Sequence, residues 1–352
     1  MKTPHVAVVL MNLGGPSSLE DVEPFLFNIF SDPDVIRLPA GFLWQRWFAR
    51  RISGRRAPES REIYEKIGGR SPILEHTLSQ GAALEAALGD GYRTYVAMRH
   101  WKPHTEEAVD RLVEAGATEV VALPLYPQRS FTTSGSSMRE LRRVLAKKAP
   151  HLKLSEVCCF PRDAGFVDEW AAAIRQKLEG IPPHRRAAAQ VLFSAHGLPQ
   201  ETIDRGDPYL DHVQATVRAV MGRLPEGLSH RLAFQSRATR VKWLEPATEH
   251  VLEELAAAGV KDVIVVPIAF VTEHVETLYE LDLLLKEPAV AAGIDGYHRV
   301  SPPGIAPGLI EGLAARIREA QDAEAGYVCG GLEGARCPQE RGARRRSPRA
   351  TP

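Results

Sequence analysis

"TEHVLEELAAAGVKDVIVVPI", residues 248–268, aligns without a gap with "TEEAVDRLVEAGATEVVALPL", residues 105–125. Each copy has the apolar spacing of an amphipathic helix, then an Ala-Gly pair that ends the helix, then a β-branched run that ends in proline and an aliphatic residue. A helix that leads straight into a buried strand is the repeating unit of α/β proteins with parallel sheets. Because the two registers match throughout, the stretch predicts a duplicated α/β unit.

A second matched pair extends the duplication to the start of each unit. "VVLMNLGGP" (8–16) corresponds to "VLFSAHGLP" (191–199), and each is a strand that runs into a glycine-containing turn. We therefore expect two similar Rossmann-like α/β domains, each a parallel sheet flanked by helices, with the active-site cleft between them. The expected divisions are residues 1–128 with a returning helix from 303–328, residues 129–302, and a C-terminal extension, 329–352, whose arginine-rich end is predicted to be disordered.

Composition and charge narrow the class of protein. The 352 residues carry 44 Lys and Arg against 44 Asp and Glu, which argues against a nucleic-acid binder held by phosphate contacts. Hydrophobic content of 44% predicts a sizeable core, and no apolar run reaches the ~18 residues of a membrane span, so the cytoplasm is the expected location. "NLGGP" lacks the G-x-G-x-x-G spacing and no Walker pattern occurs, so we expect no nucleotide cofactor.

Acidic side chains and histidines gather where two predicted strands end. His196 follows the strand in "LFSAHGLP", and "AFVTEHVETLYELD" (269–282) follows the strand in "DVIVVPI". On the helix expected there, Glu273, Glu276 and Glu280 fall on one stripe at i, i+3 and i+7. The alternative is a solvated face, with Glu273 stabilised by the helix dipole. Because working groups cluster at the carboxyl edge of a parallel sheet, this set predicts binding of a divalent metal such as ferrous iron, or proton transfer.

The predicted cleft draws side chains from both halves of the chain. The first half supplies an apolar residue, two basic residues and the loop "YPQRSFTTSGSS", and the second half supplies groups that exchange protons. In chain order, the candidates for substrate contact are Leu13, Arg99, His100, Tyr126, Ser130, Ser236 and Trp243, and Arg237 is also expected in the cleft. Leu13 and His196 hold corresponding places in the repeat, so we expect the two halves to differ in chemistry.

Five motifs together resemble the ferrochelatase family, in order and spacing from about residue 5 to about residue 320. They are "MNLGGP" (11–16), "LPLYPQRSFTTSGSS" (123–137), "LFSAHGLP" (192–199), "FQSR" (234–237) followed by "KWLEP", and "FVTEHVETLYELD" (270–282). The resemblance implies the chelatase fold. It also implies a lyase that inserts ferrous iron, as a substrate, into a porphyrin late in heme synthesis and releases two protons.

The resemblance also implies roles for single residues. His196 would accept pyrrole protons or bind the incoming metal, and Glu276 would lie opposite it across the porphyrin. Further implied groups are a metal or proton path formed by Glu273, His274 and Glu280, and pocket walls that include Arg99 and Trp243. A base on one face and an acidic relay on the other would divide the removal of the two pyrrole protons.

Leu13 bears on the choice of porphyrin. Family members that act on protoporphyrin IX commonly carry an apolar residue there, whereas those that act on coproporphyrin III commonly carry tyrosine. We therefore expect protoporphyrin IX as substrate and heme b as product, with coproporphyrin III as the alternative. The sequence departs from the family at "ATRVKW" (238–243), at Arg129, where tyrosine is frequent, and at His100, where a phenol is common; none of these touches His196 or the acidic stripe.

Two further functions stay open from the sequence alone. A cobalt or nickel chelatase for another tetrapyrrole would use the same fold and the same histidine-acid pairing. A carrier that stores or delivers porphyrin or metal would bind the same ligands without catalysis, although binding alone needs neither a base nor an acidic relay. Porphyrin absorbance separates the two, because binding shifts the bands whereas insertion collapses the free-base pattern. Monomer and homodimer are both compatible with the sequence.

The stretch "GFLWQRWFARRISGRR" (41–56) predicts an amphipathic helix. Its apolar stripe comprises Leu43, Trp44, Trp47, Phe48 and Ile52, with Arg46 and Arg50 on the opposite face. A helix that faces the core is one interpretation. By the family resemblance, the stretch would instead form the lip of the porphyrin pocket and contact the inner face of the cytoplasmic membrane transiently and peripherally.

Four cysteines occur, and in a cytoplasmic chain they indicate free thiols or metal ligands rather than disulfides. Some ferrochelatases carry a C-terminal C-x2-C-x4-C segment that binds a two-iron, two-sulfur cluster together with one internal cysteine. Here Cys329 and Cys337 keep the outer positions, and Leu332 occupies the middle one. Cys159 resembles the internal ligand, which leaves Cys158 as the candidate for a fourth thiolate. A purified protein without iron and visible absorbance would exclude the cluster.

Overall fold

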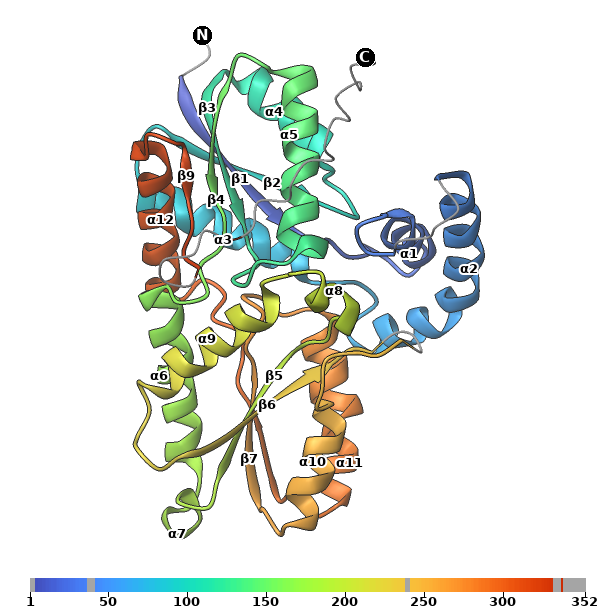
Figure 1. The fold of residues 1–352 in the computed structure, drawn as a ribbon, viewed down its shortest axis with the longest axis vertical. Helices are drawn as coiled ribbons and strands as arrows, with labels where there is room; N and C mark the ends of the chain where they lie inside the picture. Colours follow the sequence, from blue (N-terminus) through green and yellow to red (C-terminus); the bar gives the residue numbers. More distant parts are fainter. Residues whose placement is uncertain (1–3, 37–41, 238–240, 332–336, 338–352) are drawn as a thin grey trace, which may run out of the picture.

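The structure, a computed structural model, describes residues 4–36, 42–237, 241–331 and 337, so the tail predicted to be disordered, 338–352, lies outside the described residues. Two parallel β-sheets with helices packed on them follow one another along the long axis of the molecule (Figure 1). This arrangement confirms the predicted α/β class with two similar parallel-sheet units.

Both sheets are built in the same order. The first sheet contains, in spatial order, β2 (Tyr92–Met98), β1 (His5–Asn12), β3 (Ala117–Pro124), β4 (Lys153–Val157) and β9 (Tyr327–Val328). The second contains β6 (Ser229–Gln235), β5 (Gln190–His196), β7 (Asp262–Pro267) and β8 (Gly296–Arg299). Every pairing is parallel, and the order β2-β1-β3-β4 recurs as β6-β5-β7-β8. The two aligned copies of the repeat therefore supply β3 and β7, which hold equivalent positions.

The helices alternate with the strands along the chain. Before β4 come α1 (Val22–Ser31), α2 (Phe42–Lys66), α3 (Ile73–Leu88), α4 (Thr105–Ala115), the π-helix η1 (Phe131–Gly135) and α5 (Ser136–Lys148). After β4 come α6 (Ala164–Gly180), α7 (Pro183–Arg186), α8 (Gln200–Asp204), α9 (Tyr209–Met221), α10 (Thr248–Ala257), the π-helix η2 (Glu276–Leu284), α11 (Lys286–Ala291) and α12 (Pro307–Asp322). Helices α1 and α2 project sideways from the body of the molecule (Figure 1).

Strand β1 shows how the parallel sheet is buried on both faces. Val8 and Leu10 belong to one hydrophobic core with Leu84 of α3, whereas Val9 packs in a separate core with Leu112 of α4. Successive side chains of a strand point to opposite faces, so a continuous apolar run needs helices on both sides. The run "VAVVLM" therefore fixes β1 as a central strand.

The boundary between the two units lies further along the chain than the sequence predicted. The expected division after residue 128 is wrong for β4, because this strand pairs with β3 in the first sheet, Glu119 beside Lys153. The repeat could be traced only as far as β3, and the short, half-polar run "KLSEV" gave no signal of a fourth strand. From the expected returning segment, 303–328, β9 pairs with β4 at the outer edge of the first sheet.

The loops that follow the strands of the two sheets contact each other. Gln128, after β3, donates from Nε2 to the carbonyl oxygen of Ile268, after β7, at 3.3 Å. Ser130 donates from Oγ to Oδ2 of Asp207 at 2.9 Å. The carboxyl edges of the two sheets therefore meet in the middle of the molecule (Figure 1), where groups from both units share one region.

Among the described residues, none of the helices combines the length and the apolar composition that crossing a bilayer requires.

Candidate active site

His196 and Glu276 form a direct pair at the carboxyl edge of the second sheet. His196 is the last residue of β5, and Glu276 begins η2, which follows the neighbouring strand β7. Nδ1 of His196 lies 2.7 Å from Oε2 of Glu276. The side chains are 37% and 18% exposed, so solvent reaches the histidine. The expectation that Glu276 faces His196 across the substrate is therefore wrong for this conformation, because adjacent parallel strands bring both groups to the same wall.

Ser236 and Gln235, which follow one another at the end of β6, connect the pair to a second carboxylate. The Ser236 hydroxyl donates to Glu280 Oε2 at 2.5 Å and approaches Glu276 Oε2 at 3.2 Å. Gln235 Nε2 donates to Glu280 Oε2 and to the carbonyl oxygen of Glu276, both at 3.0 Å. Ser236 has a φ of 65°, a left-handed backbone that a non-glycine residue rarely adopts. Such backbone strain is typical of functional sites.

Burial and neighbouring charges shift the pKa values of Glu276, Glu280 and His196 by different amounts and in different directions. Burial favours a neutral Glu276, but the His196 imidazole, together with His274 and the Ser236 hydroxyl, outweighs burial and lowers the pKa of Glu276 to about 2. Burial, followed by the charge of Glu276, raises the pKa of Glu280 to about 7. Burial opposes the charged form of His196, yet Glu276 and Glu280 together raise its pKa. The site therefore holds a carboxylate, a base and a carboxyl that exchanges protons near neutral pH.

The predicted acidic stripe is only partly continuous. Helix η2 begins at Glu276, so Glu273 and His274 lie before it, not on the same helix face. Arg299 of β8 donates from Nη1 to both oxygens of Glu273, at 2.8 and 3.1 Å, and Thr277 donates to Oε2 at 2.5 Å. The carboxylate of Glu273 thus accepts hydrogen bonds from two other side chains, Arg299 and Thr277. Its predicted role in a metal path stays a prediction, as does that of His274.

The imidazole of His274 packs edge-on against Phe270, with ring centroids 4.4 Å apart. Its Nδ1 is buried and has no hydrogen-bond partner among the described residues. Burial, which outweighs the nearby carboxylates of Glu276 and Glu273, lowers the pKa of His274. A neutral imidazole with a buried, unpaired nitrogen is compatible with the predicted ligand role.

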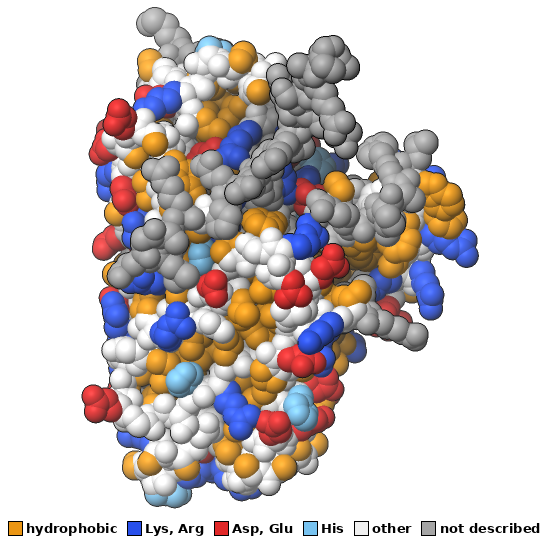
Figure 2. All heavy atoms as spheres, in the orientation of Figure 1, with side chains coloured by type: hydrophobic (Ala, Val, Ile, Leu, Met, Phe, Trp, Pro, Cys, Tyr) orange, Lys and Arg blue, Asp and Glu red, His pale blue; other side chains and the backbone are white. Residues whose placement is uncertain are grey.

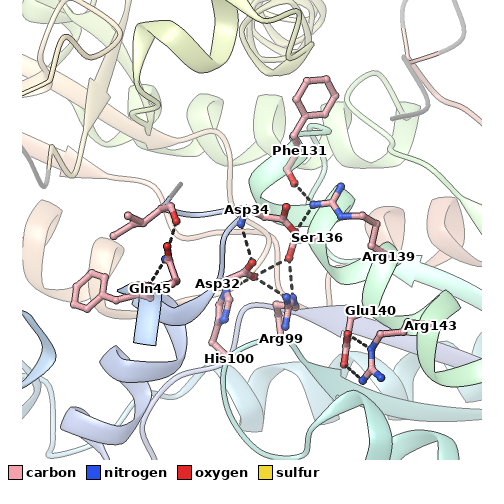
Figure 3. A network of polar contacts seen from close by, with 12 residues as sticks. Asp32, Asp34, Gln45, Arg99, His100, Phe131, Ser136, Arg139, Glu140 and Arg143 are labelled. Carbon is pink, nitrogen blue, oxygen red and sulfur yellow. Dashed lines mark hydrogen bonds and ion pairs between the residues drawn. The ribbon is translucent and has the colours of Figure 1, made fainter. Parts of the chain in front are cut away.

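Arg99 and His100, the predicted basic wall of the first unit, contact polar side chains of the same unit (Figure 3). Arg99 donates from Nε to Ser136 Oγ at 2.7 Å, and its Nη2 lies 2.8 Å from Asp32 Oδ2. His100 is 1% exposed, and its Nε2 lies 3.9 Å from the same carboxylate oxygen. The carbonyl oxygen of Leu13 accepts the backbone N–H of His100 at 2.9 Å, so Leu13 lies beside this wall. Contacts of these residues with a porphyrin stay predictions.

The other residues predicted to contact the substrate differ in how far they are exposed to solvent. Ser130 is fully buried, and its hydroxyl donates to Asp207, so its contact with a substrate stays a prediction. Tyr126 is half-buried. Trp243 pairs through its backbone with Pro199, in the loop that follows His196. Arg237 is exposed. The residues that follow it, 238–240, lie outside the described residues.

Sequence reasoning missed two residues that position the pair. Tyr209 of α9 donates from its hydroxyl to the carbonyl oxygen of His196 at 2.9 Å. Arg299 holds Glu273 and also donates from Nε to Asp282 at 2.6 Å. Arg299 is the last residue of β8, so the rule that functional groups follow parallel strands would have found it. No sequence signal marks Tyr209, because its contact depends on how α9 crosses the sheet.

Helix α2 exposes aromatic residues and buries small and polar ones. Trp44 and Trp47 are 60% and 57% exposed, and their rings contact each other edge to face at 5.7 Å. The buried positions are Gln45, Ala49, Ser53 and Ala57. The interpretation of a tryptophan-bearing face turned to the core is therefore wrong. Figure 2 shows apolar and basic side chains side by side on this projection. The side chain of Leu43 lies outside the described part.

The four cysteines meet in one group around the ends of β4 and β9. Their Sγ atoms all lie within 4.8 Å of one another, and Cys158, Cys159 and Cys337 are buried. The structure therefore brings Cys158 into the set whose fourth member the sequence left open. Four thiolates at this spacing could hold a metal.

Known proteins resemble the chain over nearly its whole length. The family model named Ferrochelatase matches residues 5–321. Proteins named ferrochelatase from Geobacter metallireducens and Citrifermentans bemidjiense are 47% and 44% identical over 314 residues, which covers 89% of this chain and 98% of each relative. Among solved structures, SirB from Bacillus subtilis with Fe3+ shares the fold, with a TM-score of 0.53 at 15% identity, covering 90% of this chain and 95% of SirB. Since the family model includes both His196 and Glu276, and these relatives align over 314 residues, the chain belongs to the ferrochelatase family, whose members are lyases that insert a metal ion into a porphyrin.

Proposed function

We propose that the protein inserts ferrous iron into protoporphyrin IX to form heme b, with His196 as the proton acceptor. The observation that carries the proposal is the 2.7 Å contact between His196 Nδ1 and Glu276 Oε2. An ionised carboxylate at this distance accepts the Nδ1 hydrogen and fixes the tautomer of the neutral imidazole. Nε2 is then the nitrogen with a lone pair, on a side chain that solvent reaches. Assignment of the proton to Nδ1 follows from this hydrogen bond.

The pair would act as a general base with an orienting partner. When Nε2 takes a pyrrole proton, the imidazolium is stabilised by the carboxylate of Glu276, as in other histidine-carboxylate pairs. Insertion releases two protons, so a second acceptor is needed. Glu280 lies next in line through the Ser236 hydroxyl, which contacts both carboxylates. These oxygens would also replace water ligands of the incoming iron one at a time.

The choice of porphyrin rests on Leu13. Its backbone lies beside the wall formed by Arg99 and His100, and its side chain is half-buried and apolar. An apolar surface suits the vinyl-bearing edge of protoporphyrin IX better than a carboxylate-bearing edge. We propose protoporphyrin IX on this ground, with coproporphyrin III as the alternative substrate.

The test is anaerobic insertion of ferrous iron into both porphyrins, followed by absorbance, with the wild-type protein and the variant H196A. We expect collapse of the free-base pattern, faster with protoporphyrin IX, and a loss of about 10²–10⁴-fold in the variant. The exposed His250 of α10 supplies the matched control, because H250A should retain wild-type rates. Band shifts without collapse in the wild-type protein would show a carrier instead, and insertion of cobalt or nickel only would show another chelatase.

We also propose that the α2 projection contacts an anionic membrane peripherally. Exposed Trp44 and Trp47 stand beside exposed arginines, including Arg51, whose guanidinium lies 5.8 Å from the Trp47 ring centre. Interfacial aromatic rings with adjacent cations are typical of such surfaces. Flotation with anionic liposomes should capture the wild-type protein and lose the W44A/W47A variant. Equal flotation of both would contradict the proposal, and neutral liposomes give the control for charge.

A further inference from the structure

The cysteine group lies where two paired strands end. Cys158 and Cys159 directly follow β4, and Cys329 directly follows β9. Because β4 and β9 are parallel neighbours, with Val157 beside Val328, the residues after each strand come side by side. The backbone continues the pairing, since the N–H of Cys158 donates to the carbonyl oxygen of Val328 at 2.8 Å. Three of the four thiols are thus placed by the sheet itself.

The thiols are close enough to share one ligand. Cys159 Sγ lies 3.9 Å from Cys329 Sγ and 3.6 Å from Cys337 Sγ, and Cys329 Sγ lies 3.2 Å from Cys337 Sγ. All four Sγ atoms, Cys158 included, are within 4.8 Å of each other. None of these separations is a disulfide bond, and all four cysteines are free.

Two hydrogen-bond donors from other side chains face the cysteine group, and each contacts a different sulfur atom. Arg129 Nη1 lies 3.6 Å from Cys158 Sγ, and His212 Nε2 lies 3.4 Å from Cys337 Sγ. His212 Nδ1 accepts the backbone N–H of Arg129 at 3.2 Å, so the hydrogen of the neutral imidazole is on Nε2 and points to the sulfur. Both groups are almost fully buried. The Arg129 cation offsets the negative charge of a thiolate, and the His212 N–H donates a hydrogen bond to another. Arg129 is one of the positions where the sequence departs from its family.

The spacing distinguishes a single ion from a two-iron cluster. Four thiolates at ~2.3 Å from one tetrahedral zinc ion lie about 3.8 Å apart. Two of the three Sγ separations given above, 3.9 and 3.6 Å, are close to this value, and the third is 3.2 Å. In a two-iron, two-sulfur cluster each iron takes only two of the four thiolates, so thiolates on different irons lie further apart than the two on one iron. No pair in this group exceeds 4.8 Å. The spacing therefore favours one ion over the two-iron cluster that the family resemblance implied.

We propose that Cys158, Cys159, Cys329 and Cys337 bind a single tetrahedral metal ion, with zinc as the expected occupant, in place of a two-iron, two-sulfur cluster. Zinc prefers closed tetrahedral thiolate sites and binds more tightly than ferrous iron to the same ligands. The ion has no open position for substrate. By binding all four cysteines, it would link the end of β9 and Cys337 to the end of β4. This role is structural and separate from the chemistry at His196.

The test uses the full-length protein, purified anaerobically without chelators from cells supplied with iron and zinc. Metal content, acid-labile sulfide and the visible spectrum are measured. We expect one metal ion per chain without labile sulfide, and, after exchange with Co2+, the intense visible bands of tetrahedral thiolate coordination. Two irons with two labile sulfides per chain would overturn the proposal. A chain that stays free of metal after reduction and exposure to Zn2+ would also overturn it.

Two further measurements show that the ion is at the cysteines and not at His196. In the wild-type protein, titration with a mercurial should release the metal as four thiols react; release that does not follow thiol modification would contradict the assignment. The variant C329S should lose the ion, whereas S155A, a buried serine of β4, should keep it. The titration needs no variant, so it decides the question even if C329S does not fold.

Discussion

His196 and Glu276 come from segments 80 residues apart, and a single hydrogen bond joins them. The position of His196 at a strand end was evident from "LFSAHGLP", and that of Glu276 from the acidic run after the next strand. Their direct contact was not, because the family resemblance suggested opposite faces of the substrate. The sheet order resolves this: β5 and β7 are neighbours, so their carboxyl ends are adjacent.

Gly197 is required by the close packing around the pair. A Cβ at this position would lie 2.8 Å from the carbonyl oxygen of Gln235 and 3.5 Å from the Trp243 ring. We expect G197A to lower the free energy of unfolding by about 1–3 kcal/mol, because a backbone atom has to move. Urea denaturation measures the change. Gly180, with open space at its Cβ, gives the control, and equal stability of G197A and G180A would refute the packing argument.

His100 makes stability depend on pH. Burial, reinforced by the charges of Arg99 and His104, lowers the pKa of His100 to about 3 in the folded protein. The unfolded chain takes up this proton near pH 6.5, so the contribution is fully present above that pH and is lost as pH falls towards 3. Between pH 7 and pH 5 the loss should be about 2 kcal/mol. Chemical denaturation across this range measures it.

The variant H100Q isolates that contribution, because glutamine does not titrate. Its free energy of unfolding should fall less steeply between pH 7 and pH 5 than that of the wild-type protein. H250Q, which changes an exposed histidine, is expected to keep the wild-type slope. Parallel curves for H100Q and the wild-type protein would contradict the burial argument.

Helix η2 and strand β8 show how elements position the site. The sequence pattern located the helix but placed Glu273 on it, whereas the helix begins three residues later. The start depends on a contact that spacing does not encode: Arg299 of β8 binds Glu273 ahead of the helix and Asp282 within it. One guanidinium therefore fixes the loop and the helix that carry Glu276.

Removing Arg299 should loosen this element. The Arg299 side chain is 12% exposed, and its loss leaves two partly buried carboxylates without their partner. We expect R299L to lower the free energy of unfolding by about 3 kcal/mol and to reduce insertion activity, because Glu276 loses its support. Arg231 pairs with Glu254 on the surface and supplies the control, for which R231L should cost well under about 1 kcal/mol. Similar losses for both variants would exclude the positioning role.

At the scale of the whole molecule, the duplication was the most reliable sequence signal. Matching helix and strand registers predicted two equivalent units, and the order β2-β1-β3-β4 recurs as β6-β5-β7-β8. The boundary was misplaced, since β4 and β8 are short and carry no shared motif. The grouping of the four cysteines could likewise not be predicted from the sequence, because it depends on the pairing of β9, near the end of the described chain, with β4. Local patterns specify elements, whereas long-range pairing specifies what those elements bring together.

The central claim is that His196 and Glu276 act as one unit, and a double-mutant cycle tests it most directly. The rate constant kcat/KM for ferrous insertion is measured for the wild-type protein, H196A, E276Q and the double variant, with circular dichroism to confirm folding. Each single change should cost about 10²–10⁴-fold, and the double variant should be no worse than the more damaged single variant. Losses that multiply in the double variant would show two independent groups and contradict the paired mechanism.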